Sequence, residues 1–155
     1  MSSAPTLVIF DCDGVLVDSE VIAARILAEC LGEAGFAVTV EHAAALGVGK
    51  SATTFGAAVE QEFGRPLPPD FMEGMRARIM AAFTHELRAV KGVDRLLAAL
   101  TLPRCVASNG HIDRVRHALA ATRLLLHFDP HIYTAAMVAR SKPAPDLFLF
   151  CRRAT

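Results

Sequence analysis

The chain has 155 residues, of which 53% are hydrophobic and 21% are charged, and its 16 acidic and 16 basic side chains give a formal net charge of zero. This composition argues against intrinsic disorder and predicts one domain, or one domain with a small insertion. A neutral chain lacks the cationic surface that a general nucleic-acid binder needs, and no apolar run approaches the roughly 18 residues that span a bilayer. We expect neither nucleic acid nor a membrane as a partner.

The N-terminus and the cysteines indicate the compartment. Residues 1–6 have neither a basic region nor an apolar core, so they do not resemble a secretory signal. None of the four cysteines forms a CxxC pair, and we expect buried free thiols. The six histidines show no i,i+4 pair on a plausible helix, which argues against zinc. These features predict a cytoplasmic protein.

The predicted elements begin with a strand over residues 6–12. Its contiguous bulky residues 7–10 are typical of a central parallel strand that is covered on both faces. The strand ends at Asp13-Gly14, which is a turn signal. Asp18 and Ser19 can each cap the helix that follows, Val21 and Ile22 belong to its predicted apolar face, and Gly35 ends it.

The next part of the chain, residues 41–87, shows apolar side chains at helical spacing and no convincing strand, and Ser51 can cap a helix within it. After it, we predict alternating elements: helices over 93–100, 112–119 and from 146 to the end, with strands over 104–107 and 131–133. This order predicts an α/β fold with a Rossmann-like parallel sheet, in which the helical stretch is an insertion after the first strand. Open α/β sheets bind ligands beyond the carboxyl ends of their strands.

Asp11 and Asp13 are the main chemical signal, because they lie at the carboxyl end of the first predicted strand. Side chains two residues apart in an extended segment project to the same side, so we expect the two carboxylates to face together. A divalent cation relieves their repulsion, and hard oxygen ligands suit Mg²⁺. The alternative is a solvated Asp-Gly turn. A calcium loop is a poor alternative, because it needs glycine where Leu16 stands and glutamate where Ile22 stands.

Two further segments carry candidate site residues. Ser108 follows the second predicted strand, where its hydroxyl and the next backbone N–H groups can cradle a phosphate. Lys142 stands before Pro143 and Pro145, which restrict its backbone, so its ammonium group is a candidate for neutralising phosphate and carboxylate charge. Taken singly, Ser-Asn-Gly is also typical of an ordinary loop, and Lys142 of a solvated surface lysine.

In combination the three segments are far more specific. Asp-x-Asp-Gly-Val-Leu-Val-Asp-Ser-Glu from Asp11, Ser-Asn-Gly from Ser108 and Lys-Pro-x-Pro-Asp from Lys142 resemble the haloacid dehalogenase (HAD) superfamily of phosphohydrolases. The resemblance runs from about residue 7 to the C-terminus. It is greatest to members with a helical cap inserted after the first motif, such as sugar-phosphate phosphatases and β-phosphoglucomutase-like enzymes.

The resemblance implies a role for each matching residue. Asp11 matches the nucleophile that forms an aspartyl-phosphate, and Asp13 matches the general acid/base. The carboxylate of Asp11 and the backbone carbonyl of Asp13 match ligands of Mg²⁺. Ser108 and Asn109 match the phosphate-binding motif, and Lys142 matches the cation that stabilises the transferred charge. An acid at position 13 favours hydrolysis of a phosphate ester over dehalogenation, because a halide leaving group needs no proton.

The resemblance also implies a division of the chain. Residues 1–15 and 91–155 match the α/β core, and residues 16–90 match the mobile cap. Residues 47–50 lie where such caps carry a specificity loop, so Lys50 is a candidate for binding a polar group of the substrate. The alternative is a solvated lysine at a helix start.

The sequence departs from the family at its end. Family members continue after the Lys-Pro helix with a strand that ends in an acidic pair, whereas this sequence stops at Thr155. We expect an incomplete sheet that lacks the strand of this fourth motif, an exposed edge on the first strand and weak Mg²⁺ binding. The resemblance predicts a magnesium-dependent phosphatase for a small phosphorylated metabolite such as a sugar phosphate, impaired by truncation. A sugar phosphomutase and a non-catalytic truncated remnant are the alternatives, and the oligomeric state is open.

Overall fold

The computed structural model describes residues 6–47, 50 and 52–155, which divide into two compact units. The α/β unit comprises the described residues up to Asp18 together with Leu87–Thr155. The helical unit comprises Ser19–Glu86. No described helix has both the length and the apolar character needed to cross a membrane.

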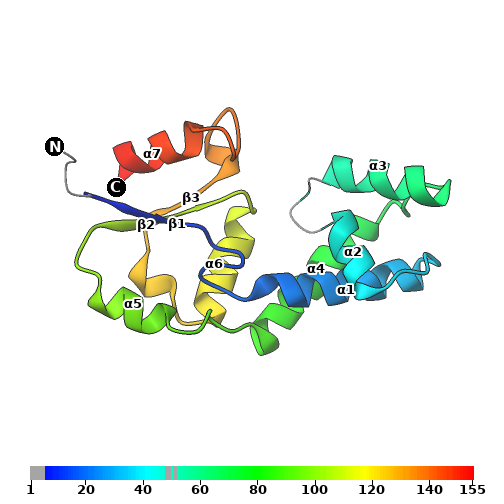
Figure 1. The fold of residues 1–155 in the computed structure, drawn as a ribbon, viewed down its shortest axis with the longest axis horizontal. Helices are drawn as coiled ribbons and strands as arrows, with labels where there is room; N and C mark the ends of the chain where they lie inside the picture. Colours follow the sequence, from blue (N-terminus) through cyan, green and yellow to red (C-terminus); the bar gives the residue numbers. More distant parts are fainter. Residues whose placement is uncertain (1–5, 48–49, 51) are drawn as a thin grey trace. The chain divides into compact units, whose positions relative to one another are not determined.

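The α/β unit contains a parallel sheet with the strand order β1-β2-β3. Its elements are β1 (Val8–Phe10), α5 (Val93–Ala99), β2 (Arg104–Ser108), α6 (Ile112–Ala121), β3 (Ile132–Thr134) and α7 (Asp146–Ala154), with short 3-10 turns at Leu125–His127 and Ala135–Met137. Helix α7 covers one face of the sheet, and α5 and α6 lie on the other (Figure 1). The α/β class and the parallel sheet predicted from the sequence are confirmed.

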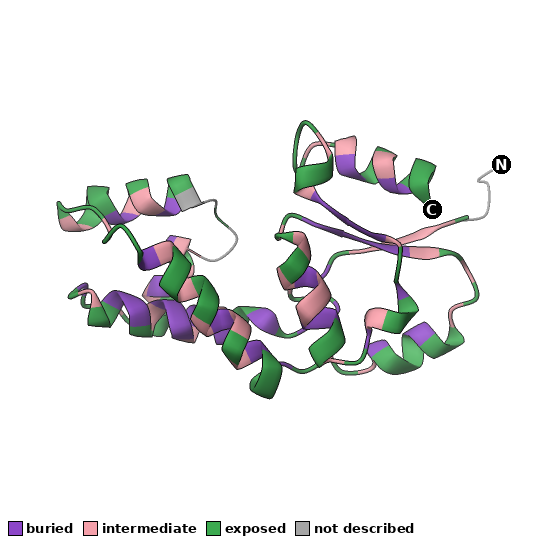
Figure 2. Cartoon of the chain, turned by 180° about the vertical axis from the view of Figure 1, so that it is seen from behind, coloured by how far each residue is buried: buried purple, intermediate pink, exposed green. Residues whose placement is uncertain are grey.

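Alternation along the strands builds a core on both faces of the sheet. On the face covered by α7, the buried cluster consists of Cys105, Ala107, Tyr133, Leu147 and Cys151. On the other face, the rings of Phe10 and Phe128 meet edge to face, with their centroids 5.6 Å apart. Residue burial therefore concentrates on β2 and β3 and on the inner sides of the helices (Figure 2).

The first strand is shorter and less buried than the sequence predicts. β1 spans Val8–Phe10, whereas the prediction was residues 6–12, and all three of its residues are only half-buried. Within the described residues it pairs with β2 alone, so it is an edge strand. This agrees with the exposed edge that the resemblance led us to expect, whereas the apolar run of the strand taken alone indicated a central strand. The bulky residues of β1 lack a second neighbour of the kind that buries a central strand.

The chain leaves β1 through a tight turn, and the residues after this turn form backbone hydrogen bonds with residues 88–90, which lead back to the sheet. Gly14 adopts a left-handed conformation with a φ of 71°, and its N–H donates to the carbonyl of Val17 (2.9 Å). Leu16 accepts a hydrogen bond from Val90 N–H, and Asp18 N–H donates to Arg88, both at 3.0 Å. The outgoing and returning segments are thus tied together by an antiparallel bridge inside the α/β unit.

The described residues of the helical unit form four helices. They are α1 (Ser19–Glu33), α2 (Val40–Gly47), α3 (Ala52–Phe63) and α4 (Phe71–Glu86). Gly35 ends α1 as the sequence predicts. With a φ of 81° it allows Phe36 N–H to donate to Leu31 and its own N–H to donate to Gly32, the two bonds of a left-handed helix end.

The described helices refine two local predictions for this unit. Gly47 belongs to α2 rather than to a loop, and a side chain there would approach Leu27 Cδ2 to 2.5 Å. Val21, expected on the apolar face of α1, is 68% exposed, while Ile22 is buried. The remainder of the predicted loop, Val48 and Gly49, and the predicted cap Ser51 lie outside the described residues.

Candidate active site

The register of the sheet brings the first two motifs to adjacent strand ends. Phe10 of β1 lies beside Val106 of β2, so Asp11 follows β1 where β2 still has two residues to run. Ser108 is the last residue of β2 and pairs with Thr134 of β3. The carboxyl ends of parallel strands meet at one edge of a sheet, which is where such sheets bind ligands.

Asp11 presents a carboxylate that is held from two sides and remains accessible. Its Oδ1 accepts a hydrogen bond from Cys12 N–H at 2.7 Å and lies 2.8 Å from Nζ of Lys142. The Asp11 side chain is 46% exposed, whereas that of Lys142 is only 15% exposed. An approaching anion would therefore meet the positive charge of Lys142 beside the accessible carboxylate of Asp11.

Lys142 is fixed by contacts at both ends of its side chain. Nζ also donates to the carbonyl oxygen of Ala107 at 2.8 Å. The Lys142 backbone exchanges two hydrogen bonds of 3.0 Å with the Asn109 side chain: Nδ2 donates to the Lys142 carbonyl, and Lys142 N–H donates to Oδ1. The structure thus joins residues from all three sequence motifs, and the Lys142 side chain is largely covered rather than solvated.

Ser108 and Gly110 form a compact turn after β2. Ser108 is buried, and its Oγ accepts a hydrogen bond from Gly110 N–H at 3.0 Å. A side chain at position 110 would place its Cβ 3.2 Å from Ser108 Oγ and 3.3 Å from Val115 Cγ2. A side chain at this position would therefore crowd the turn against Ser108 and α6.

Asp13 has a partner that sequence reasoning missed. Its Oδ2 forms an ion pair and hydrogen bond with Nη2 of Arg114, a residue of the first turn of α6. Both side chains are about two-thirds covered, with 27% of Asp13 and 30% of Arg114 exposed. The signal that was available is a basic residue one helical turn beyond Ser108-Asn109-Gly110, on the helix that starts at the second motif.

Cys12 lies between the two aspartates in the sequence and is 1% exposed, in agreement with the alternation of an extended segment. Burial raises the pKa of its thiol to about 12, and the neighbouring carboxylate of Asp13 adds to that rise. The thiol therefore stays protonated at neutral pH and does not compete with Asp11 as a nucleophile.

The donor set at this edge suits a hard cation. The Asp11 carboxylate and the Asp13 backbone carbonyl supply the oxygen ligands that Mg²⁺ prefers. In the described part of the chain, no group of three or more His, Cys, Asp or Glu side chains is placed to hold a metal ion. This segment therefore offers Mg²⁺ suitable oxygen atoms, namely one side-chain carboxylate and one main-chain carbonyl, but no cluster of carboxylates among its described residues.

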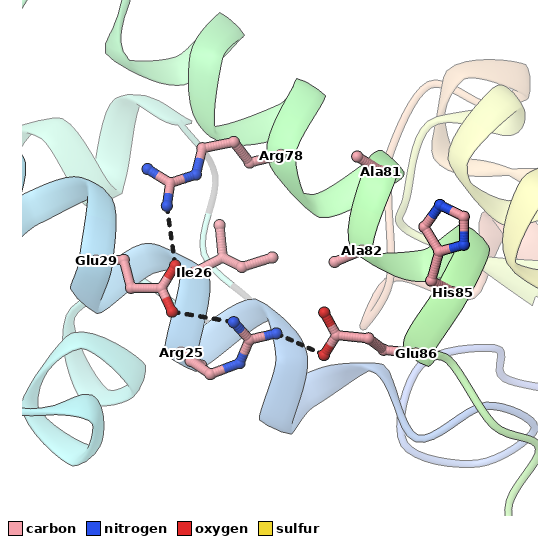
Figure 3. Close-up of a pocket in the computed structure, with 8 residues that line it drawn as sticks. All are labelled: Arg25, Ile26, Glu29, Arg78, Ala81, Ala82, His85 and Glu86. Carbon is pink, nitrogen blue, oxygen red and sulfur yellow. Dashed lines mark hydrogen bonds and ion pairs between the residues drawn. The ribbon is translucent and has the colours of Figure 1, made fainter.

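The remaining predicted site residue, Lys50, belongs to the helical unit. It is exposed, and its Nζ donates to the carbonyl of Ala45 at 2.7 Å. The same unit has a surface hollow of about 330 Å³ between α1 and α4 (Figure 3). Its charged walls pair with one another, since Arg25 contacts Glu29 and Glu86, and Arg78 contacts Glu29. None of the predicted catalytic residues lines this hollow.

Comparison with known proteins gives a consistent family. The sequence pattern of the family described as haloacid dehalogenase-like hydrolase matches residues 8–155. The chain is 33% identical over 148 residues to a 6-phosphogluconate phosphatase of Escherichia coli (strain K12), covering 95% of this chain and 67% of the relative.

Solved structures give the same result. A haloacid dehalogenase-like protein of unknown function from Agrobacterium tumefaciens is 36% identical with a TM-score of 0.83, over 96% of this chain and 68% of that one. A HAD family hydrolase from Deinococcus radiodurans, solved with bound phosphate and sodium, is 32% identical with a TM-score of 0.77, over 96% of this chain and 66% of that one. A putative β-phosphoglucomutase from Thermotoga maritima shares the fold at 19% identity, with a TM-score of 0.78 over 97% of this chain and 70% of that one.

Proposed function

We propose that this chain, which belongs to the haloacid dehalogenase-like hydrolase family, is a magnesium-dependent phosphatase that hydrolyses a small phosphorylated metabolite through an aspartyl-phosphate on Asp11. The observation that carries the proposal is the 2.8 Å contact between Lys142 Nζ and Asp11 Oδ1. In this contact a largely buried cation lies against the accessible carboxylate of Asp11 at the carboxyl end of β1. A phosphate dianion is attracted there although the nucleophile itself is negative.

The first chemical step transfers the phosphoryl group to the protein. A carboxylate oxygen of Asp11 forms a bond to phosphorus while the bond from phosphorus to the ester oxygen breaks. Protonated Asp13 gives its proton to the departing oxygen, which leaves as an alcohol. Lys142 remains beside Asp11 and stabilises the negative charge on the phosphoryl oxygens in transit.

The second step releases the phosphoryl group to water. Asp13, now a carboxylate, takes a proton from a water molecule whose oxygen forms a bond to phosphorus, and the bond to the Asp11 oxygen breaks. Inorganic phosphate leaves, Asp11 is regenerated as a carboxylate, and Asp13 is again protonated. Ser108 and Asn109 are proposed to orient the phosphoryl oxygens from the second motif.

Membership of the family implies magnesium, and Asp11 and the Asp13 carbonyl are the groups that would hold it. When bound, Mg²⁺ supplies charge neutralisation for the phosphoryl oxygens. The division into a core of residues 1–15 and 91–155 and a cap of residues 16–90, with Lys50 as a residue that selects the substrate, also remains a proposal.

A sugar phosphate is the substrate class that we propose. The relative at 33% identity is a phosphatase for 6-phosphogluconate, a phosphorylated sugar acid. The likeness to a β-phosphoglucomutase structure is at 19% identity and concerns the fold, so a phosphatase is favoured over the mutase alternative.

The test is phosphate release by the purified 155-residue chain. A panel of sugar phosphates that includes 6-phosphogluconate is assayed with Mg²⁺ and with a chelator, beside the Asp11→Asn variant as the matched control. We expect release that requires both Mg²⁺ and Asp11. Turnover that needs an added bisphosphorylated sugar would indicate a mutase, and release no greater than that of Asp11→Asn on every ester would support the non-catalytic alternative.

A further inference from the structure

We propose that Arg114 is a positioning residue that orients the carboxyl group of Asp13 for proton transfer to the leaving group. This inference rests on the proposed function, because it assigns a part in the first chemical step. Its basis is the ion pair between Arg114 Nη2 and Asp13 Oδ2, which joins α6 to the turn that follows β1.

The position of Arg114 is set by the second motif. His111 caps α6 by accepting a hydrogen bond from Asp113 N–H, and Val115, the neighbour of Arg114, is 1% exposed. A Cβ at Gly110 would lie 3.5 Å from Arg114 Nε and 3.2 Å from Ser108 Oγ. The Arg114 side chain, which extends from α6, therefore passes close to the turn that carries the buried Ser108 hydroxyl.

Each aspartate of the first motif thus contacts a cationic side chain from a later part of the chain. Lys142 contacts Asp11, the proposed nucleophile, and Arg114 contacts Asp13, the proposed acid. The two cations are suited to different tasks. Lysine is a compact point charge, whereas the guanidinium of arginine is planar and donates in fixed directions, and here Nη2 holds one oxygen of the Asp13 carboxyl group.

A guanidinium group does not itself supply the proton that is transferred. Arginine donates hydrogen bonds but does not give up its proton in proteins, so it does not replace Asp13 as the acid. Because the contact uses Oδ2 and both side chains are about two-thirds covered, it restricts the orientation of the Asp13 carboxyl group more than an exposed surface pair would. Loss of the contact should therefore impair general-acid catalysis more than phosphate binding.

The experiment measures how kcat/KM depends on the leaving group in wild type and in Arg114→Met. kcat/KM covers the steps up to formation of the aspartyl-phosphate, so hydrolysis of that intermediate does not enter. Alkyl phosphates need a proton on the departing oxygen, whereas 2,4-dinitrophenyl phosphate does not. We expect a loss of about 10- to 100-fold for alkyl phosphates, within the range of general-acid catalysis, and a change of less than about threefold for the dinitrophenyl ester.

Arg116→Met is the matched control. Arg116 lies on the same helix and forms an ion pair of 2.6 Å with Asp129, and these side chains are 41% and 44% exposed. This variant removes an arginine–aspartate pair from α6 without touching Asp13, and its kcat/KM should show the wild-type dependence on leaving group. Arg114→Lys keeps the charge without the planar group and should recover only part of the loss on alkyl phosphates.

Three results would overturn the inference. Equal losses for both kinds of ester would assign Arg114 to phosphate binding or to folding, and unchanged kinetics would leave it no part in the reaction. If Arg114→Met does not fold, as judged by its urea midpoint against Arg116→Met, the leaving-group comparison is made with Arg114→Lys, where an unaltered dependence would contradict the proposal. A wild-type chain that cleaves no ester overturns the proposed function itself and is recognised before any Arg114 variant is assayed.

Discussion

Asn109 and Lys142 are joined by two reciprocal hydrogen bonds of 3.0 Å, in which the amide side chain of Asn109 both donates to and accepts from the backbone of Lys142. The two residues are 33 positions apart in the sequence. These hydrogen bonds hold the backbone of Lys142, whose ammonium group contacts Asp11 Oδ1. Asn109 of the second motif therefore positions Lys142 of the third motif.

Replacement of Asn109 should therefore reduce turnover with little loss of stability. In Asn109→Ala both hydrogen bonds to Lys142 are lost, and we expect kcat to fall about 10- to 100-fold, the scale of a displacement of about 1 Å in a catalytic group. Asn109 is exposed, so the free energy of unfolding should change by no more than about 1 kcal/mol per hydrogen bond. The kcat of Asn109→Asp, which keeps the acceptor Oδ1, should lie between those of wild type and Asn109→Ala. A wild-type kcat in Asn109→Ala would show that the position of Lys142 does not depend on this pair of hydrogen bonds.

Gly110→Ala should disturb the phosphate-binding turn. The added Cβ would stand 3.2 Å from Ser108 Oγ and 3.3 Å from Val115 Cγ2, which forces the turn or α6 to shift by a few tenths of an ångström. We expect a raised KM for the phosphate ester and a loss of about 1 kcal/mol in unfolding free energy, a typical cost of crowding a packed position. Steady-state kinetics together with urea unfolding measure both effects, and Gly74→Ala, which meets nothing within 4 Å, is the control.

Two glycines near the end of α1 should respond in opposite directions. Gly35 has a φ of 81°, and a Cβ there would lie 3.0 Å from Arg65 Nη2, so Gly35→Ala should destabilise the protein by about 1 to 2 kcal/mol. Gly32 lies inside the helix with nothing within 4 Å, so Gly32→Ala should stabilise it by about 0.5 kcal/mol. Urea midpoints that shift in the same direction for both variants would contradict this assignment of the helix end.

The sequence was sufficient for the fold class because its strongest signals are local. The apolar run before Asp11, the helical spacing of residues 41–87 and the glycine at position 35 each reflect a short stretch of chain. The edge position of β1 did not follow from its own residues, which indicated a central strand; it was expected only from the resemblance to a family whose fourth-motif strand this sequence lacks. Whether a bulky strand is central or at an edge depends on which strands pair with it, and its own residues do not contain that information.

The site shows the same limit. Asp11, Ser108 and Lys142 could be singled out because each stands at the end of an element or before a proline, where spacing alone is informative. Arg114 could not be identified, because arginines recur on the same helix at positions 114 and 116 and only tertiary structure distinguishes them. One reaches Asp13 across 101 positions of sequence, and the other contacts Asp129.

The buried thiols predict how stability depends on pH. Burial raises the pKa of the Cys151 thiol to about 12 from 9.0, and the adjacent Cys105 adds to the rise. Between these values the unfolded chain loses the proton and the folded chain keeps it, so the contribution of Cys151 to the free energy of unfolding is constant below pH 9 and falls as the pH rises from 9 toward 12. Cys151→Ala removes this contribution. We expect the difference between wild type and Cys151→Ala in urea unfolding to shrink from pH 8 to pH 10.5, and a constant difference would contradict the shift.

The most direct test of the central claim is to detect the covalent intermediate on Asp11. The Asp13→Asn variant is mixed with 2,4-dinitrophenyl phosphate and Mg²⁺, quenched in acid and digested, and the peptides are analysed by mass spectrometry. The dinitrophenyl ester needs no acid to leave, but hydrolysis of the intermediate needs a base at position 13. We predict that one phosphoryl group accumulates on Asp11 and is absent when Asp11→Asn is added to the same variant. Release of phosphate without any adduct, or an adduct on another residue, would contradict the account.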